Sequence, residues 1–216
     1  MNKKTYDTIL WDLDGTIIQS HPGIFNGFLY ALGKIGIVET DTSKLYRAIG
    51  PGIQDTLKDV YHLEGDKLNL TLEYYREYYG TTGLFEYKTY EGIPQLIRKA
   101  KNAGKKIGLA TAKPQIYAVR VLERIGISDC FDFVGGNILQ NNRLSKSEII
   151  DMCLEKLEVT DKSSVVLVGD TKYDAEGAIK SGIDCVGVLY GYGDKNALEK
   201  ATVIADDLQC LENILI

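Results

Sequence analysis

A buried strand and an acidic turn meet in one stretch of this sequence, Ile9-Leu10-Trp11-Asp12-Leu13-Asp14-Gly15-Thr16. The apolar residues before Asp12 are typical of a strand with both faces covered, and Gly15 allows a sharp turn after it. Asp12 and Asp14 are two residues apart, so both carboxylates lie on one side at the carboxyl end of the strand, where α/β sheets bind ligands. Their mutual repulsion favours a divalent cation with oxygen ligands. The alternative is a plain turn capped by an Asp side chain.

Further buried strands alternate with helices along the chain. We expect strands at Thr8–Leu13, Ile107–Thr111, Val165–Val168 and Ile183–Leu189, with weaker candidates at Phe131–Val134 and Thr202–Ala205. Helical patterns lie between them, one followed by Gly104 and another running from Pro114 to Gly126. Strands that alternate with helices in this way predict an α/β fold with a doubly wound parallel sheet.

One long region breaks this alternation. From about residue 17 to residue 87 the pattern indicates helices, the first beginning at Pro22, and no convincing strand. Such a block, inserted after the first strand, predicts a small helical domain over the carboxyl edge of the sheet. We therefore expect a catalytic α/β core from residues 1–16 and 88–216, and a helical domain from residues 17–87.

A second buried strand also ends in an acidic residue. Val165–Val168 is followed by Gly169 and Asp170, and Asp174 comes four residues later. If this strand neighbours the first, Asp170 can reach the same cation as Asp12, and Asp174 shares a helix face with Asp170 if the helix has begun there. The alternative is that Asp170 only caps the helix.

Two positions between these strands could bind phosphate. Thr111 ends its strand and offers a hydroxyl, followed by backbone N–H groups at the start of the next helix. Lys146 precedes a helix and can bring a positive charge to a phosphoryl oxygen. A capping Thr and a solvated Lys are the alternatives for these two residues.

Composition limits the partners. The chain has 216 residues and a formal net charge of −5, with no run of basic residues, which argues against nucleic acid. No apolar stretch is long enough for a membrane span, and the start of the chain is too acidic for a signal peptide. The four cysteines are widely spaced and apolar in context, as reduced core residues are. We expect a cytoplasmic monomer or homodimer that acts on a small molecule.

The acidic and phosphate-binding candidates match, in order, the four motifs of a known family. Asp12-Leu13-Asp14-Gly15-Thr16, Thr111, Lys146, and Gly169-Asp170 with Asp174 resemble those of the haloacid dehalogenase superfamily. The helical insert resembles its cap domain, and the resemblance implies a Rossmann-like core. The likeness runs the whole length and is greatest to phosphoglycolate phosphatase-like and bacterial 5'-nucleotidase-like members, through segments 50–52, 74–78 and 187–193.

The resemblance assigns roles to individual residues. Asp12 would be the nucleophile and Asp14 the general acid and base. Mg²⁺ would be held by Asp12, Asp170 and the Asp14 carbonyl, with support from Asp174. Thr111 and Lys146 would bind the phosphoryl oxygens.

Substrate-binding candidates are fewer and less specific. They are Arg47, Gly50 and Gln54 in the helical insert, and Ala112 and Lys113 after the second motif. Many relatives have a polar residue at the position of Ala112, which is a departure from the family pattern. An ordinary turn between helices is the alternative for the segment around Gly50.

The leading interpretation is a Mg²⁺-dependent phosphomonoesterase that hydrolyses phosphoglycolate or a nucleoside 5'-monophosphate. A sugar-phosphate mutase resembling β-phosphoglucomutase is the alternative within the fold. A non-catalytic module that accepts or binds phosphate is the alternative from another class, although receiver-type modules are smaller and lack the insert.

Overall fold

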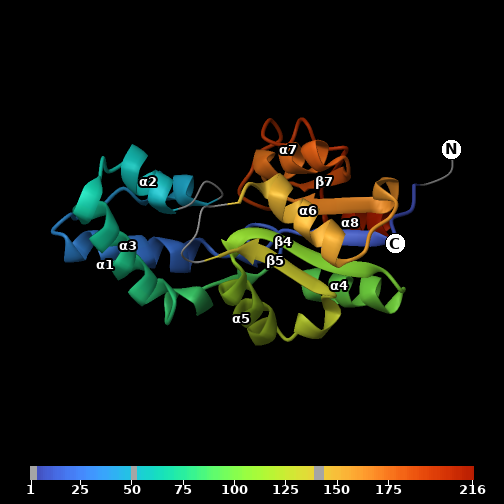
Figure 1. Ribbon diagram of the computed structural model, residues 1–216, viewed down its shortest axis with the longest axis horizontal. Coiled ribbons are helices and arrows are strands. Elements are labelled where there is room, and N and C mark those ends of the chain that lie inside the picture. Colours follow the sequence, from blue (N-terminus) through green and yellow to red (C-terminus); the bar gives the residue numbers. More distant parts are fainter. Residues whose placement is uncertain (1–3, 50–52, 139–143) are drawn as a thin grey trace. The chain divides into compact units, whose positions relative to one another are not determined.

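The computed structural model describes residues 4–49, 53–138 and 144–216, with strands and helices alternating over most of the chain (Figure 1). The strands are β1 (Thr8–Trp11), β2 (Ile18–Gln19), β3 (Lys88–Thr89), β4 (Lys106–Pro114), β5 (Phe133–Asn137), β6 (Val165–Gly169), β7 (Asp184–Val188) and β8 (Val203–Ala205). The α-helices are α1 (His21–Lys34), α2 (Ile53–Asp59), α3 (Gly65–Tyr79), α4 (Ile93–Asn102), α5 (Gln115–Ile125), α6 (Lys146–Lys156), α7 (Lys172–Ser181) and α8 (Leu208–Leu215). Short 3-10 helices are Thr42–Ala48, Gly83–Phe85, Ser128–Cys130 and Lys162–Ser164.

Six strands form a parallel sheet in the order β5-β4-β1-β6-β7-β8. Trp11 at the end of β1 pairs with Leu109 of β4 on one side and with Val168 of β6 on the other. The strand order runs outward from β1 in both directions, which places the topological switch point beside β1. The predicted doubly wound sheet is confirmed, and the carboxyl end of β1 is the position where such sheets bind ligands.

Helices cover both faces of this sheet. α6 and α7 pack against each other; α6 contacts β4 and β5, and α7 contacts β6 and β7. α4 and α5 also contact β4, and Figure 1 shows them on the face opposite α6. α8 contacts β8. Leu10 and Leu167 from the sheet pack with Ile149 and Ile150 of α6 and Ala175 of α7. These buried side chains supply the main stabilisation, because each buried aliphatic side chain contributes about 1.5–3 kcal/mol.

The helix ends have local causes that the sequence shows. Gly126 adopts a left-handed conformation with φ 80° after α5, as expected for a residue that closes a helix. Ser145 and Glu148 form a reciprocal capping box at the start of α6, which fixes Lys146 as the first residue of that helix. No helix in the described ranges has both the length and the apolar character that a bilayer crossing requires.

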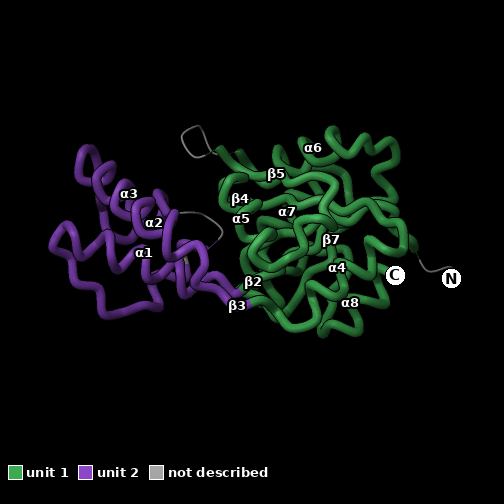
Figure 2. The backbone as a smooth tube through the Cα atoms, turned by 90° about the horizontal axis from the view of Figure 1, so that it is seen from below, with its two compact units in different colours: residues 1–18, 89–216 green, residues 19–88 purple. Residues whose placement is uncertain are grey.

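The chain divides into two compact units, residues 1–18 with 89–216, and residues 19–88 (Figure 2). The boundaries lie within two residues of those expected from the sequence. In the smaller unit α1 packs against α3, and the stripe Leu68, Leu72, Tyr75 and Tyr79 is buried. The chain passes between the units through β2 and β3, which pair with each other.

Two expectations about local structure were wrong, and one alternative is excluded. Residues 17–87 do contain a strand, because Ile18 and Gln19 form the short β2. β4 does not end at Thr111 but continues through a register shift to Pro114. α7 begins at Lys172 with Thr171 as its N-cap, so Asp170 precedes the helix and does not cap it. The bounds of β2 and β4 depend on pairing with other strands, which the local pattern does not record, whereas the start of α7 is set by the capping box of Thr171 and Asp174.

Candidate active site

The parallel pairing of β1 and β6 brings two acidic residues together. The backbone N–H of Asp12 donates to the carbonyl oxygen of Val168 at 2.9 Å, so the chain after β1 stays beside the end of β6. Asp12 lies two residues after Leu10, which faces α6 and α7, and its side chain is directed to the same face. Asp170 follows β6 directly.

Three buried carboxylates converge at this position: Asp12, Asp170 and Asp174. One ligand oxygen from each lies within 4.8 Å of the other two. Asp12 is 7% exposed, whereas Asp170 and Asp174 are fully buried. Three carboxylates this close, removed from water, require positive charge beside them.

Lys146 supplies one such charge from the first turn of α6. Its ammonium nitrogen lies 2.7 Å from Oδ1 of Asp12 and 2.7 Å from Oδ1 of Asp174, and it also donates to the carbonyl oxygen of Ala110 at 2.9 Å. Burial alone would lower the pKa of Lys146, but the two carboxylates raise it above its usual value. Lys146 is therefore a permanent cation within the cluster.

One lysine does not balance three carboxylates. Burial raises the pKa of Asp12 well above its ordinary value, although Lys146 opposes the shift and Asp174 adds to it. Burial likewise raises the pKa of Asp170, and the nearby carboxylates of Asp174 and Asp12 raise it further. The protein alone thus leaves negative charge in this cluster that is poorly compensated.

Asp14 is oriented differently from Asp12. Its Oδ2 lies 2.9 Å from the ammonium nitrogen of Lys113, whose side chain is only 4% exposed. Its Oδ1 is buried and accepts no hydrogen bond from any residue that the structure describes. Asp14 thus lies next to the cluster in sequence but has a cation of its own.

Thr111 is buried on β4, and its hydroxyl oxygen accepts a hydrogen bond from the backbone N–H of Lys113 at 3.2 Å. The adjacent carbonyl of Ala112 accepts from the side-chain amide of Asn137 at 2.7 Å. The oxygen of that amide accepts from the N–H of Leu144 at 2.8 Å. Asn137 thus ties the Thr111–Lys113 segment to β5 and to the chain entering α6.

The candidates in the helical insert belong to the smaller unit. Gly50 and the side chain of Arg47 lie outside the described residues. Gln54 is exposed on α2, in the smaller unit. Their assignment to substrate binding remains a prediction.

Comparison with known proteins identifies the family. The family model described as "Haloacid dehalogenase-like hydrolase" matches residues 9–188, which include the whole carboxylate cluster and Lys146. The chain belongs to this family. It is 31% identical over 212 residues to a 5'-nucleotidase from Pseudomonas aeruginosa, covering 97% of this chain and 96% of that protein.

Two further relatives agree with this membership. A phosphoglycolate phosphatase from Pseudomonas putida is 25% identical over 217 residues, covering 94% of this chain and 77% of the relative. The crystal structure of a phosphatase candidate from Clostridium difficile superimposes with a TM-score of 0.91 at 38% identity, covering 99% of this chain and 100% of that one. The expected family and enzyme class are confirmed: this chain is a phosphatase of the haloacid dehalogenase-like hydrolases.

The residues of this haloacid dehalogenase-like hydrolase fit a divalent cation. Carboxylate oxygens are the ligands that Mg²⁺ prefers, and the cluster of Asp12, Asp170 and Asp174 has more negative charge than Lys146 compensates. Asp170 is already held by two donors, the Thr16 hydroxyl and the Tyr192 backbone N–H, and Asp174 by Thr171. Such bonds orient ligating carboxylates in metal sites.

Sequence reasoning missed several of these supporting residues. Asn137 stands alone in its segment and has no motif around it. Lys113 was expected to meet substrate, and only the folded chain shows its pairing with Asp14. Tyr192 acts through its backbone N–H, which no side-chain pattern can reveal. The one available signal was the segment 187–193, which supported the likeness to the phosphatase branch.

Proposed function

We propose that this protein is a Mg²⁺-dependent phosphomonoesterase that forms an aspartyl-phosphate on Asp12. The observation that supports this most is the buried cluster of Asp12, Asp170 and Asp174 with Lys146 at the carboxyl ends of β1 and β6. Phosphoryl transfer depends mainly on positioning and on neutralising charge, and this arrangement supplies both.

The chemistry divides between the two aspartates of the first motif. A carboxylate oxygen of Asp12 attacks phosphorus, and the bond from phosphorus to the ester oxygen breaks. Asp14 gives its proton to the departing oxygen, and then takes a proton from the water that hydrolyses the aspartyl-phosphate. Oδ1 of Asp14, which has no hydrogen-bond partner among the described residues, is available for this transfer, while Lys113 holds Oδ2.

Other residues orient and neutralise the phosphoryl group. Lys146 holds the Asp12 carboxylate through a 2.7 Å contact and can also reach a phosphoryl oxygen as a point charge. The Thr111 hydroxyl and the backbone N–H groups beyond it are the second phosphoryl contact. Asp12, Asp170, Asp174 and the Asp14 carbonyl would hold Mg²⁺, which supplies charge neutralisation for the phosphoryl oxygens.

The substrate we propose is a small phosphorylated metabolite, either phosphoglycolate or a nucleoside 5'-monophosphate. The relatives named 5'-nucleotidase and phosphoglycolate phosphatase support these two classes. We assign the choice between them to the smaller unit, with Arg47, Gly50 and Gln54 as candidates there, and Ala112 and Lys113 as candidates in the core.

Release of inorganic phosphate from a panel of phosphate esters tests this function. Activity should disappear in excess chelator and return with Mg²⁺, whereas Ca²⁺ should inhibit because it prefers a larger and looser coordination shell. Lys146→Met should lose activity. Lys200→Met is its matched control and should keep activity, because Lys200 pairs with Glu176 on the surface. Full activity in chelator, or equal activity of the two lysine variants, would contradict the proposed site.

A further inference from the structure

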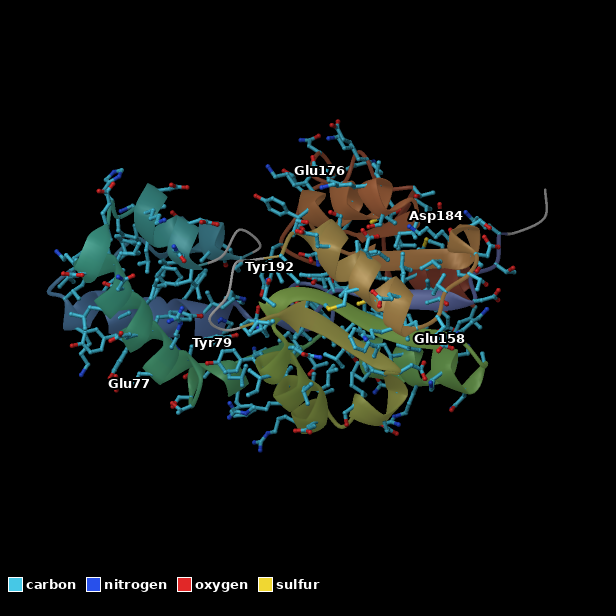
Figure 3. All side chains as sticks on the ribbon, in the orientation of Figure 1. Glu77, Tyr79, Glu158, Glu176, Asp184 and Tyr192 are labelled. Atoms are coloured by element: carbon cyan, nitrogen blue, oxygen red, sulfur yellow. The ribbon has the colours of Figure 1, made fainter. Side chains whose placement is uncertain are left out.

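The loop after β7 lies against one of the acidic residues, and its sequence is Tyr190-Gly191-Tyr192-Gly193. Tyr192 is labelled in Figure 3. We propose that this loop is a positioning element, which fixes the Asp170 carboxylate for the divalent cation. The inference rests on the proposed function, in which Asp170 is a metal ligand.

Direct hydrogen bonds support this proposal. The backbone N–H of Tyr192 donates to Oδ2 of Asp170 at 2.7 Å, and the Thr16 hydroxyl donates to Oδ1 at 3.0 Å. Each oxygen of Asp170 therefore has a donor among the described residues, and Asp170 is fully buried. A carboxylate held at both oxygens cannot rotate freely, so its remaining lone pairs keep a fixed direction.

The two glycines allow the loop to approach this closely. A Cβ atom at Gly191 would lie 2.3 Å from Cβ of Asp170, and one at Gly193 would lie 1.9 Å from its backbone carbonyl oxygen. Both contacts are with the backbone or the stem of Asp170, which cannot move aside as the end of a long side chain can. Any larger residue at either position must therefore shift the loop or Asp170 itself.

Tyr190 anchors the loop to the first motif. Its hydroxyl donates to the carbonyl oxygen of Thr16 at 3.0 Å, so it holds the same residue whose hydroxyl contacts Asp170. Its ring packs on the ring of Tyr90, with the centroids 4.6 Å apart. The backbone N–H of Tyr90 in turn donates to Ile17 at 3.0 Å. The loop, the first motif and the chain after β3 thus form one connected network around Asp170.

Metal affinity measured without substrate tests the proposal. The variants are Tyr190→Phe and Gly191→Ala, and the probe is Mn²⁺, followed by electron paramagnetic resonance, with Mg²⁺ as the competitor. Loss of one partly buried hydrogen bond predicts that Tyr190→Phe weakens Mn²⁺ binding by about 3- to 10-fold. Gly191→Ala should weaken it by more than about 10-fold, because its Cβ collides with the ligand residue.

Two matched variants separate positioning from general stability. The Tyr6 hydroxyl donates to Oδ2 of Asp184 at 2.7 Å, and Figure 3 shows Asp184 far from Tyr192, at the other end of β7. Tyr6→Phe likewise removes a partly buried tyrosine hydrogen bond and should lower the melting temperature in chelator without changing the Mn²⁺ affinity. Gly33→Ala adds a Cβ with no described atom within 4 Å apart from its chain neighbours and the backbone of its own helix, and it should also leave the affinity unchanged.

The outcomes are distinct. If Tyr190→Phe binds Mn²⁺ as tightly as the wild type, or loses no more affinity than Tyr6→Phe, the positioning role is overturned while the proposed function stands. If Gly191→Ala does not fold, Tyr190→Phe decides alone. A wild-type protein that binds no Mn²⁺ would overturn the proposed function, and this inference with it.

Discussion

At the scale of single residues, the two aspartates of the first motif differ in the cation that holds them. Lys146 holds Asp12 within the carboxylate cluster, and Lys113 holds Asp14 outside it. If Asp12 is the nucleophile, Asp12→Asn should abolish turnover of every ester. Asp14→Asn should lower turnover of an alkyl phosphate by roughly 10²- to 10⁴-fold, because the leaving oxygen loses its proton donor.

An aryl ester separates the two roles further. p-Nitrophenyl phosphate releases a stable anion that needs little protonation, so Asp14→Asn should still become phosphorylated on Asp12. Water attack then lacks its base, and rapid-quench measurements should show a burst of nitrophenol followed by slow turnover. Mass measurement should detect the phosphorylated chain. Turnover by Asp12→Asn together with a dead Asp14→Asn enzyme would reverse the assignment.

The Lys113–Asp14 pair gives a second residue-scale prediction. Lys113→Met leaves the largely buried Asp14 carboxylate without its cation, and breaking a buried pair on one side costs about 3–5 kcal/mol when the remaining charge is fully enclosed. Asp14 retains some exposure, so the expected loss is at the lower end. The double variant Lys113→Met/Asp14→Asn should regain much of the lost free energy of unfolding, which urea denaturation measures. Additive losses across the double-mutant cycle would show that the two residues do not interact.

At the scale of elements, the start of α6 links stability to the site. Ser145 caps this helix, and Lys146 is its first residue. Ser145→Ala should cost about 1 kcal/mol in the free energy of unfolding. It should also lower kcat, because the first turn of α6, which holds the backbone of Lys146, becomes less ordered. Asp207→Ala is the matched control, because Asp207 caps α8 through the N–H of Cys210. It should lose similar stability and keep its kcat. Equal kcat values in both variants would show that the cap does not position Lys146.

The sequence predicted that a strand exists where both of its faces are buried. It predicted the residues at which strands begin and end less well. The runs ending at Asp12 and Asp170 are apolar because both faces of their strands are covered, and this pattern is local. The extension of β4 to Pro114 and the short β2 depend on pairing with other strands, which the local sequence does not encode. The acidic candidates were predictable because strand ends share one edge of the sheet. Tyr192 was not, because its contribution is a backbone N–H.

At the scale of the whole molecule, the chain separates chemistry from the proposed selection of substrate. The carboxylate cluster, Lys146 and the Asp14–Lys113 pair all belong to the unit of residues 1–18 and 89–216. The unit of residues 19–88 begins within β2 and ends within β3, and these two strands pair with each other. A short linker can therefore replace the insert without stretching the chain.

Replacing residues 19–88 by such a linker tests this division. If the insert selects the substrate, kcat/KM for the best natural ester should fall far more than kcat/KM for p-nitrophenyl phosphate, because a small generic ester needs only the groups that act on phosphorus. The Mn²⁺ affinity of the shortened protein should stay close to that of the full chain, since each acidic residue of the cluster remains. That measurement also shows that the core has kept its fold. Equal losses on both esters, with Mn²⁺ binding intact, would mean that the insert assists catalysis generally and that selection belongs to core residues such as Ala112.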